Sequence, residues 1–241
     1  MLTFAKRCAK EILRDKLNLI FGIGFPVVLL LLLSAMQANI PVELFAIESL
    51  APGITIFGLS FMTLFSATLI ARDRETSFLQ RLFTTPLKSS DFILGYMFPI
   101  IPIAAAQSLV CYFVAAILGL PVTVNVICAV LMIIPVSVFY ISLGLFCGSI
   151  FNVKQVGGIC GALLTNLSAW LSGIWFDIEL LGDAFVKIAK ALPFYHAVEI
   201  EKAIIRGDFT EIPEHFLVVM IYGMVAVFCA VRIFLLQMKK Q

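Results

Sequence analysis

Long uninterrupted apolar runs constrain this chain more than any other feature of its sequence. A helix that crosses a bilayer needs about 20 predominantly apolar residues. Because lipid offers the backbone no hydrogen-bond partner, only helices and closed barrels can cross it, and continuous apolar runs are helical. The sequence therefore predicts an all-α membrane protein, one domain over residues 1–241 with six transmembrane helices. The six runs lie near 19–37, 52–70, 92–118, 124–150, 157–175 and 214–236.

Composition agrees with this class. Hydrophobic residues make up 61% of the chain and charged residues 13%, whereas soluble domains average about 45–50% and about 25%. Basic residues precede the first run, as they do in a signal peptide, but the run is longer than a signal h-region. No small-residue cleavage pattern follows it. We expect it to be retained as the first span.

The basic residues predict the orientation. Six crossings would place thirteen of the 17 lysines and arginines on one side: before the first run, within 71–91, at Lys154, and at Arg232, Lys239 and Lys240 toward the end of the chain. Because cytoplasmic segments are enriched in Lys and Arg, we expect both termini and 71–91 to be cytoplasmic. The segment 177–206 then lies outside. Its helical apolar spacing, interrupted by Pro193, predicts two short amphipathic helices that re-enter the outer leaflet.

Two segments on the cytoplasmic side are amphipathic. Residues 3–17 carry apolar and basic stripes on opposite helix faces, which favours an interfacial helix over simple flanking charge. In 74–83, four apolar residues share one face of a two-turn helix that ends at Thr85-Pro86, because proline disfavours helical geometry in the residue before it. That face either rests on lipid or docks into another protein.

Motifs for catalysis are absent from the sequence. It contains no Gly-Lys dipeptide, and hence no Walker A loop for nucleotide phosphates. His196 and His215 alone provide too few ligands for zinc. Ser172 has no histidine or lysine partner within a span, which argues against a membrane-embedded enzyme. No acidic residue falls deep in a predicted span, so a carrier built on buried carboxylates is disfavoured.

Small and polar residues mark possible helix contacts. Gly157 and Gly161 have the small-xxx-small spacing that lets helices approach closely. Several uncharged polar side chains lie within predicted spans, where they either pack between helices or line a polar pathway. These are Gln107, Ser108, Thr165, Asn166 and Ser168.

Two stretches resemble one family. RDRETSFLQRLFTTPLKSSDFILG, residues 72–95, is similar to the first cytoplasmic loop of ABC-2 type transporter permeases. LSGIWFDIELLGDAFVKIAKALPFYHAVEIEKAIIRGD, residues 171–208, is similar to the end of their fifth span and the outer helices after it. The matching positions are Glu75, Leu79, Leu82, Thr85, Pro86, Ser172, Gly173, Leu192, Pro193, Tyr195 and Gly207. The departures are Asp177, Leu192 in place of a commoner Asn, and the acidic Glu199 and Glu201.

The resemblance implies an assembly. The segment 74–83 would be a coupling helix on a separate ABC ATPase subunit that binds ATP and Mg²⁺, while this chain binds no cofactor or metal. Two ATPase copies and a second permease, identical or a close paralogue, would complete the assembly. No nucleic acid is expected as a partner. The implied ATPase-coupling residues are Glu75, Phe78, Leu79, Leu82, Phe83, Thr85 and Pro86. The implied translocation path holds Phe57, Phe61, Phe65, Asn166 and Trp170, beside Trp175. The implied outer gate holds Ser172, Gly173, Pro193 and Tyr195.

The implied function is export across a bacterial cell membrane. We expect the cargo to be a drug, an antimicrobial peptide or a lipid-like amphipathic compound, with resistance as the biological outcome. The alternatives are a permease for polysaccharide export and a non-transporting membrane anchor or sensor for an ATPase.

Overall fold

The computed structural model describes residues 2–41, 44–76, 78, 89–175 and 178–239, and within them all regular structure is helical. The predicted all-helical fold is confirmed. In chain order the helices are α1 (Leu2–Arg14), α2 (Lys16–Gln37), α3 (Ile47–Glu75), α5 (Ser89–Met97), α6 (Ile101–Ile117), α7 (Val124–Ile150), α8 (Val153–Gly158), the π-helix η1 (Ile159–Leu164), α9 (Thr165–Leu171), the 3₁₀ helix η2 (Ile178–Leu181), α10 (Asp183–Ala191), α11 (Pro193–Arg206) and α12 (Ile212–Lys239).

Five helices in the described part of the chain are long and apolar enough to cross a membrane. They are Lys16–Gln37, Ile47–Glu75, Asp91–Ile117, Val124–Ile150 and Ile212–Ile233. The chain is thus a multi-pass membrane protein. The predicted span 157–175 is not among these helices, since it is helical only as far as Leu171 and is built from the consecutive pieces α8, η1 and α9.

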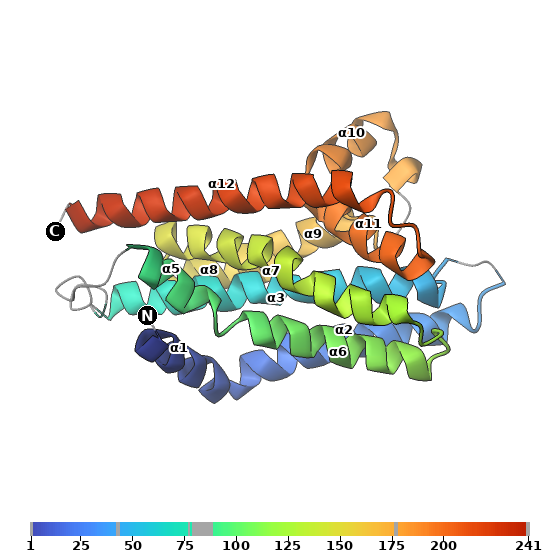
Figure 1. The fold of residues 1–241 in the computed structure, drawn as a ribbon, viewed down its shortest axis with the longest axis horizontal. Helices are drawn as coiled ribbons and strands as arrows, with labels where there is room; N and C mark the ends of the chain where they lie inside the picture. Colours follow the sequence, from blue (N-terminus) through green and yellow to red (C-terminus); the bar gives the residue numbers. More distant parts are fainter. Residues whose placement is uncertain (1, 42–43, 77, 79–88, 176–177, 240–241) are drawn as a thin grey trace.

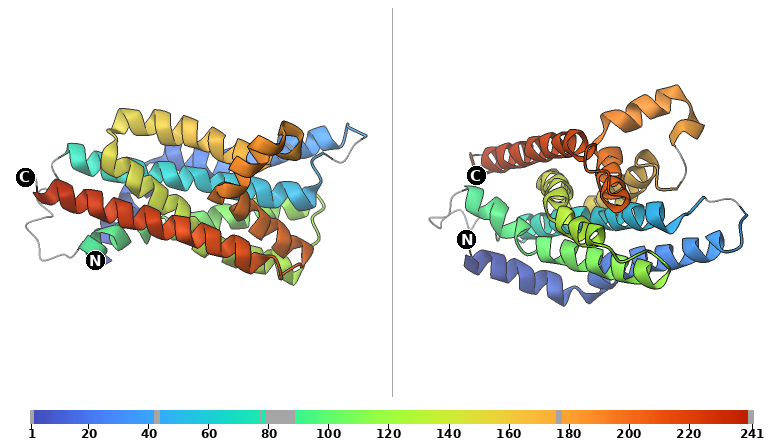
Figure 2. Two further views of the ribbon diagram at one scale, coloured as in Figure 1. Left: turned by 90° about the horizontal axis from the view of Figure 1, so that it is seen from above. Right: turned by 45° about the vertical axis from the view of Figure 1, so that its right-hand side comes forward.

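The helices form an elongated bundle in which α1 and the C-terminal part of α12 lie at the same end (Figure 1). We call this the termini end. Helices α10 and α11 lie toward the opposite end, here called the far end. The segment 153–171 runs along α3, which it contacts through α8, η1 and α9 (Figure 2).

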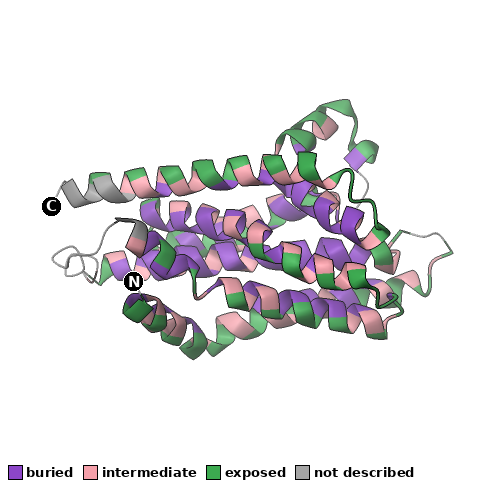
Figure 3. Cartoon of the chain, viewed as in Figure 1, coloured by how far each residue is buried: buried purple, intermediate pink, exposed green. Residues whose placement is uncertain are grey.

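Helix α3 is the centre of the bundle, because it packs against α2, α6, α7 and α11. Its residues are mostly buried, whereas α2 and α12 carry exposed faces (Figure 3). Those exposed faces are apolar, with Leu31 on α2 46% exposed and Phe228 on α12 63% exposed. Exposed apolar surface of this extent on a spanning helix fits contact with lipid.

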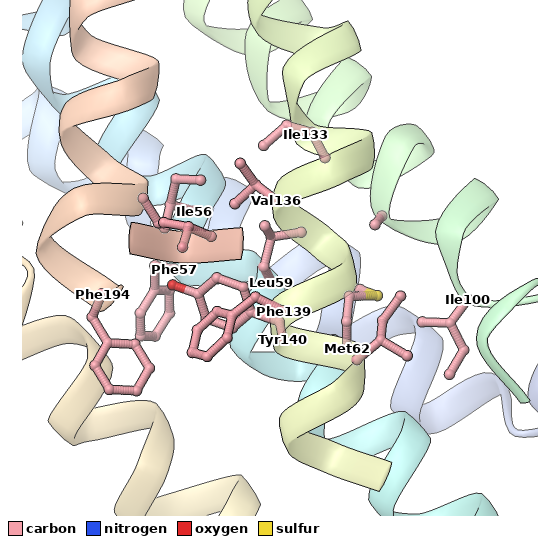
Figure 4. Packing of buried hydrophobic residues seen from close by; sticks show 14 of the residues in the cluster. Ile56, Phe57, Leu59, Met62, Ile100, Ile133, Val136, Phe139, Tyr140 and Phe194 are labelled. Atoms are coloured by element: carbon pink, nitrogen blue, oxygen red, sulfur yellow. The ribbon is translucent and has the colours of Figure 1, made fainter. Parts of the chain in front are cut away.

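A tightly packed core joins α3 to α7 and α11. Phe57 and Leu59 of α3 lie near Phe139 and Tyr140 of α7, and Phe194 of α11 packs edge-on against Phe139 (Figure 4). Aromatic side chains in such edge contacts contribute large buried apolar area. This core fixes the position of α11 on the two long helices.

Small residues let α3 and α7 approach closely. A Cβ atom on Gly144 would overlap the carbonyl oxygen of Thr63, and one on Gly148 would overlap that of Ala67. Ser66 Oγ donates across the same contact to the carbonyl of Ile141 at 3.0 Å. Close approach through small residues with polar side chains bonded across it is a common form of helix packing in membranes.

The predicted close contact at Gly157 and Gly161 is not made within this chain. A Cβ atom on Gly157 would meet no heavy atom within 4 Å, and one on Gly161 would meet only the Leu64 side chain at 3.5 Å. Close glycine contact with α3 is made instead by Gly144 and Gly148 of α7.

The prolines of the third and fourth spans have different surroundings. The third span is interrupted between Met97 and Ile101, around Pro99. Pro102 lies in the first turn of α6, where the backbone N–H that proline lacks would have no partner within the helix. Helix α7, by contrast, continues through Pro135.

Substituting Gly148 by Ala tests the α3–α7 contact. The added methyl meets backbone atoms, which cannot rotate away, and overpacking of this kind costs about 1–3 kcal/mol. We expect the unfolding temperature in detergent to fall by several degrees, measured by reaction of the six free cysteines with a thiol-reactive dye. Gly24→Ala on α2, where a Cβ meets nothing within 4 Å, is the control. Equal unfolding temperatures for both variants would contradict the close contact.

Candidate functional site

A buried carboxylate lies at the termini end of the bundle. Asp73, near the end of α3, is 1% exposed. Arg7 of α1 donates to both of its oxygens, at 2.6 and 2.5 Å. Tyr96 of α5 donates its hydroxyl to Asp73 Oδ2 at 2.7 Å. Bidentate pairing is the strongest arrangement for an arginine and a carboxylate, so one side chain joins α1, α3 and α5.

Apolar side chains cover the Asp73 side of this ion pair, while Arg7 is partly exposed. Phe4 of α1 packs edge-on against Phe92 and Tyr96 of α5, with ring centroids 5.9 and 4.9 Å apart. Cys8 is fully buried beside them, and burial raises the pKa of its thiol to about 12. The hydrogen bond that Arg7 donates to Asp73 raises the pKa of Arg7. The Asp73 charge therefore depends on Arg7, because an unpaired buried charge is costly.

The same arginine holds the start of the segment that follows α3. The guanidinium of Arg7 lies 3.9 Å from the ring centroid of Phe78, and Phe78 packs at the edge of the core. A cation over an aromatic face at this distance is attracted by the ring quadrupole. Arg7 also pairs with Glu11 at 2.9 Å. The segment after α3 is therefore attached to α1 at Phe78.

The end of α3 is held equally on its other side. Arg74 donates to the carbonyls of Gly148 and Phe151, at 2.8 and 3.2 Å, where α7 ends. Glu75 Oε1 accepts the backbone N–H of Val153 at 2.9 Å, which satisfies a free donor at the start of α8. The final turn of α3 thus contacts α1, α5, α7 and α8.

These contacts revise the predicted coupling segment. Glu75 is the last residue of α3 and not part of a separate helix, so the prediction that a helix begins at 74 is wrong. Phe78 is placed as described above. The other predicted coupling residues, Leu79, Leu82, Phe83, Thr85 and Pro86, lie outside the described residues.

The ion pair itself was missed by sequence reasoning, which treated Asp73 as part of a charged loop. One signal was present. If the helix is continued past residue 70, Ser66, Ile70 and Asp73 share a face at spacings of four and three. That face is buried in the structure, so helical periodicity carried beyond the apolar run would have found the carboxylate.

At the far end, a groove of about 590 Å³ contains three of the predicted outer-gate residues, Ser172, Gly173 and Tyr195. Gly173 has a φ of 70°, a left-handed conformation that suits glycine and turns the chain after α9. Lys202 pairs with Glu199 at 3.0 Å beside the groove. The groove therefore combines aromatic, cationic and anionic side chains.

Pro193, the fourth predicted outer-gate residue, begins α11, and Gly207 ends it in a left-handed conformation with a φ of 82°. These are the favoured places for proline and glycine at the two ends of a helix. Two short helices, α10 and α11, therefore fill 183–206 as the sequence predicted. Their depth in a membrane stays a prediction.

The structure separates the predicted path residues into two groups. Phe57 contacts Phe61 and Trp175 edge-on, at centroid distances of 6.1 and 5.9 Å, and Phe65 is buried on the same helix. These aromatic side chains belong to the packing around α3. Asn166 and Trp170 instead lie on the exposed face of α9.

The polar residues within the spans divide in the same way. Gln107, Ser108, Thr165 and Ser168 are buried inside the chain, where Gln107 donates weakly to the carbonyl of Thr55 at 3.4 Å. Asn166 is exposed and donates to the carbonyl of Ala162 at 2.8 Å within its own helical run. Most of these side chains thus pack between helices of one chain.

A second buried carboxylate lies in α11. Glu201 is fully buried, and Tyr112 of α6 donates its hydroxyl to Oε2 at 2.6 Å. Its other oxygen has no hydrogen-bond partner among the described residues. Burial raises the pKa of Glu201 to about 8. Sequence reasoning placed this residue on an outer helix and did not predict its burial.

The histidines pair with each other. His196 Nδ1 lies 2.6 Å from His215 Nδ1, and His196 Nε2 lies 2.8 Å from the carbonyl oxygen of Lys190. The carbonyl requires a proton on His196 Nε2, so Nδ1 of the neutral ring accepts from His215. The pair joins α11 to α12. In the described part of the chain, no group of three or more His, Cys, Asp or Glu side chains is arranged to hold a metal.

A family model described as ABC-2 type transporter matches residues 1–205, from α1 to the last turn of α11. The chain belongs to the ABC-2 type transporter family. The comparison with curated proteins found no match. A membrane chain of an ABC-2 type transporter is a transport subunit, generally not catalytic itself. Both the Asp73 cluster and the groove at the far end lie within the matched residues.

Replacing Asp73 by Asn tests the ion pair. The amide keeps the size of the side chain and the acceptor for Tyr96 but removes the buried negative charge that pairs with Arg7. Because Arg7 is partly exposed and retains Glu11, we expect a loss of about 2 kcal/mol, less than for a fully buried pair. Thermal unfolding in detergent measures it.

Asp15→Asn is the control, since its pair with Arg72 is more exposed and such pairs are worth about 0–1 kcal/mol. Asn also retains the N-cap of α2. An Asp73→Asn variant as stable as this control would show that the pair holds nothing together.

Glu201→Gln tests the second carboxylate. Its pKa in the folded chain lies above its ordinary value of 4.5, so ionisation opposes folding and stability falls as pH rises from about 4.5 to about 8. We expect Gln to weaken this dependence and to raise the unfolding temperature above wild type at pH 8.5. Glu214→Gln, at an exposed position, is expected to leave the pH dependence unchanged. A wild-type profile that rises with pH over this range would contradict the assignment.

Proposed function

We propose that this chain is the permease subunit of an ATP-driven exporter and that it receives its energy from a separate ABC ATPase carrying ATP and Mg²⁺. The observation that supports this most is the anchoring of the last turn of α3. Arg7 and Tyr96 hold it to α1 and α5, while Arg74 and Glu75 hold it to α7 and α8. A force applied to the segment that begins beside Phe78 would reach five helices at once.

The proposed topology has six crossings, with 153–171 as the fifth. Helix α1 and the C-terminal part of α12 lie at one end of the bundle, as an even number of crossings requires. Thirteen of the 17 lysines and arginines lie in segments that this topology puts on that side. By the positive-inside rule that side is the cytoplasm, and the proposed location is a bacterial cell membrane.

A second permease copy, identical or paralogous, would pack on the exposed face of 153–171. Gly157 and Gly158 have open space where a Cβ would lie, and Trp170 is 52% exposed. Small residues at one end allow close helix approach, and a large aromatic at the other provides contact area. Asn166 on the same face would then lie between the copies, in the proposed translocation path.

The proposed cargo is an amphipathic compound, such as a drug, an antimicrobial peptide or a lipid-like molecule. Two features support this class: the exposed Trp170 on the proposed path, and the groove at the far end, where Tyr195 lies near a Lys202–Glu199 pair. A molecule with apolar and charged parts would find partners for both.

Co-purification in mild detergent tests the partnership. The tagged chain is expected to retain an ATP-hydrolysing subunit in a roughly two-to-two complex. Leu79→Asp/Leu82→Asp is expected to lose it, because charges on the docking face would oppose its burial. Leu180→Asp/Leu181→Asp, exposed leucines of η2, makes the same change at the far end and should retain the ATPase. Absence of any ATPase with the native chain would overturn the proposal.

A further inference from the structure

A strongly basic groove of about 830 Å³ lies between α1 and the end of α3. Five of its eight lining residues are Lys or Arg and two are acidic. The groove therefore carries a net positive charge in a protein whose charged residues are few.

The cations of this groove are of two kinds. Arg7 and Arg72 have carboxylate partners, the first in Asp73 and Glu11 and the second in Asp15. Lys6, Lys10 and Arg14 are exposed and make no salt bridge with any residue that the structure describes. Spaced four residues apart, these three form one stripe along α1. Their charge is left for an anion from outside the chain.

Apolar residues beside the stripe indicate where that anion comes from. Leu2 and Leu13 of α1 are 78% and 62% exposed, and Leu17 at the start of α2 is 69% exposed. At 3.6 residues per turn, Leu2 and Leu13 fall on the side of α1 next to Lys6. A helix with exposed leucines bordering a row of cations suits the headgroup region of a membrane, where acyl chains and phosphates are adjacent. If the ligand were a free anion in water, the exposed leucines beside the cations would have no part in binding it.

We propose that this groove binds the phosphate headgroup of an anionic phospholipid. The ammonium groups of Lys6 and Lys10 and the guanidinium of Arg14 contact the phosphate oxygens, and the acyl chains lie along Leu13 and Leu17. The groove is bounded by Arg7, which also contacts Asp73 and Phe78. A bound lipid thus holds α1 against the end of α3.

The binding itself stands on the groove alone. Its regulatory consequence rests on the proposed function: a lipid that steadies α1 would strengthen the connection between the ATPase and the spans. Membranes richer in anionic lipid would then give tighter coupling between ATP hydrolysis and transport.

Lipid binding is measured on the purified chain by native mass spectrometry. Phosphatidylglycerol, phosphatidylcholine and inorganic phosphate are the three probes. We expect retention of phosphatidylglycerol over phosphatidylcholine, with no displacement by millimolar phosphate. Lys6→Gln/Lys10→Gln is expected to weaken phosphatidylglycerol binding by about 25-fold, about fivefold for each lysine near an anionic surface. Because both lysines are exposed, its unfolding temperature should match that of wild type.

Lys16→Gln/Lys154→Gln is the matched control, with the same loss of charge at exposed positions outside the groove. Equal weakening by the two variants would mean general attraction to anionic lipid and would overturn the site. Displacement of phosphatidylglycerol by inorganic phosphate would overturn the proposal of a lipid ligand and would indicate a site for a free anion.

A Lys6→Gln/Lys10→Gln variant that keeps phosphatidylglycerol but loses a co-purifying ATPase would identify a protein-docking surface and overturn the proposal. Because the lipid measurement needs no ATPase, its outcome is separate from that of the co-purification. Lipid binding without any ATPase partner would leave this proposal standing and remove only the proposed function.

Discussion

The carboxylate of Asp73 is the group on which the termini end of the structure depends. A charge that is 1% exposed among apolar side chains is stable only with partners. Arg7 and Tyr96 supply them from α1 and α5, so these helices and α3 have to assemble together. Because Arg7 also lies over Phe78, the same interaction fixes where the next segment leaves the bundle. An ion pair on the surface would not require these helices to assemble together.

Rigid packing connects this end to the rest of the molecule. Along α3 and α7, glycine contacts and hydroxyl groups bonded across the interface leave little space between the helices. Closely packed interiors shift as units and do not deform gradually. Further along, Phe194 packs α11 onto the same helices. A displacement of α3 at the termini end therefore bears directly on the helices beside the far-end groove.

The sequence was sufficient for features that a single helix determines. Apolar length located the long spans, amphipathic spacing located α1, and Pro193 located the start of α11. It was insufficient where a side chain on another helix determines the structure. Helix α3 continues through Asp73 because other helices compensate the charge, and Glu201 is buried because Tyr112 meets it. The predicted fifth span ends early at Leu171, before the left-handed turn at Gly173, which a count of apolar residues does not detect. The path aromatics were assigned by residue type, which cannot distinguish Phe57 inside the core from Trp170 outside it.

A double-mutant cycle between Arg7 and Phe78 addresses most directly whether α1 and the segment after α3 act as one unit. Arg7→Met, Phe78→Ala and the double variant are compared by how strongly transport substrate stimulates ATP hydrolysis in the reconstituted complex. If the two side chains work through their mutual contact, the double variant loses no more stimulation than Arg7→Met alone. Independent, additive losses would show that the contact carries no coupling, and that α1 and the following segment act separately.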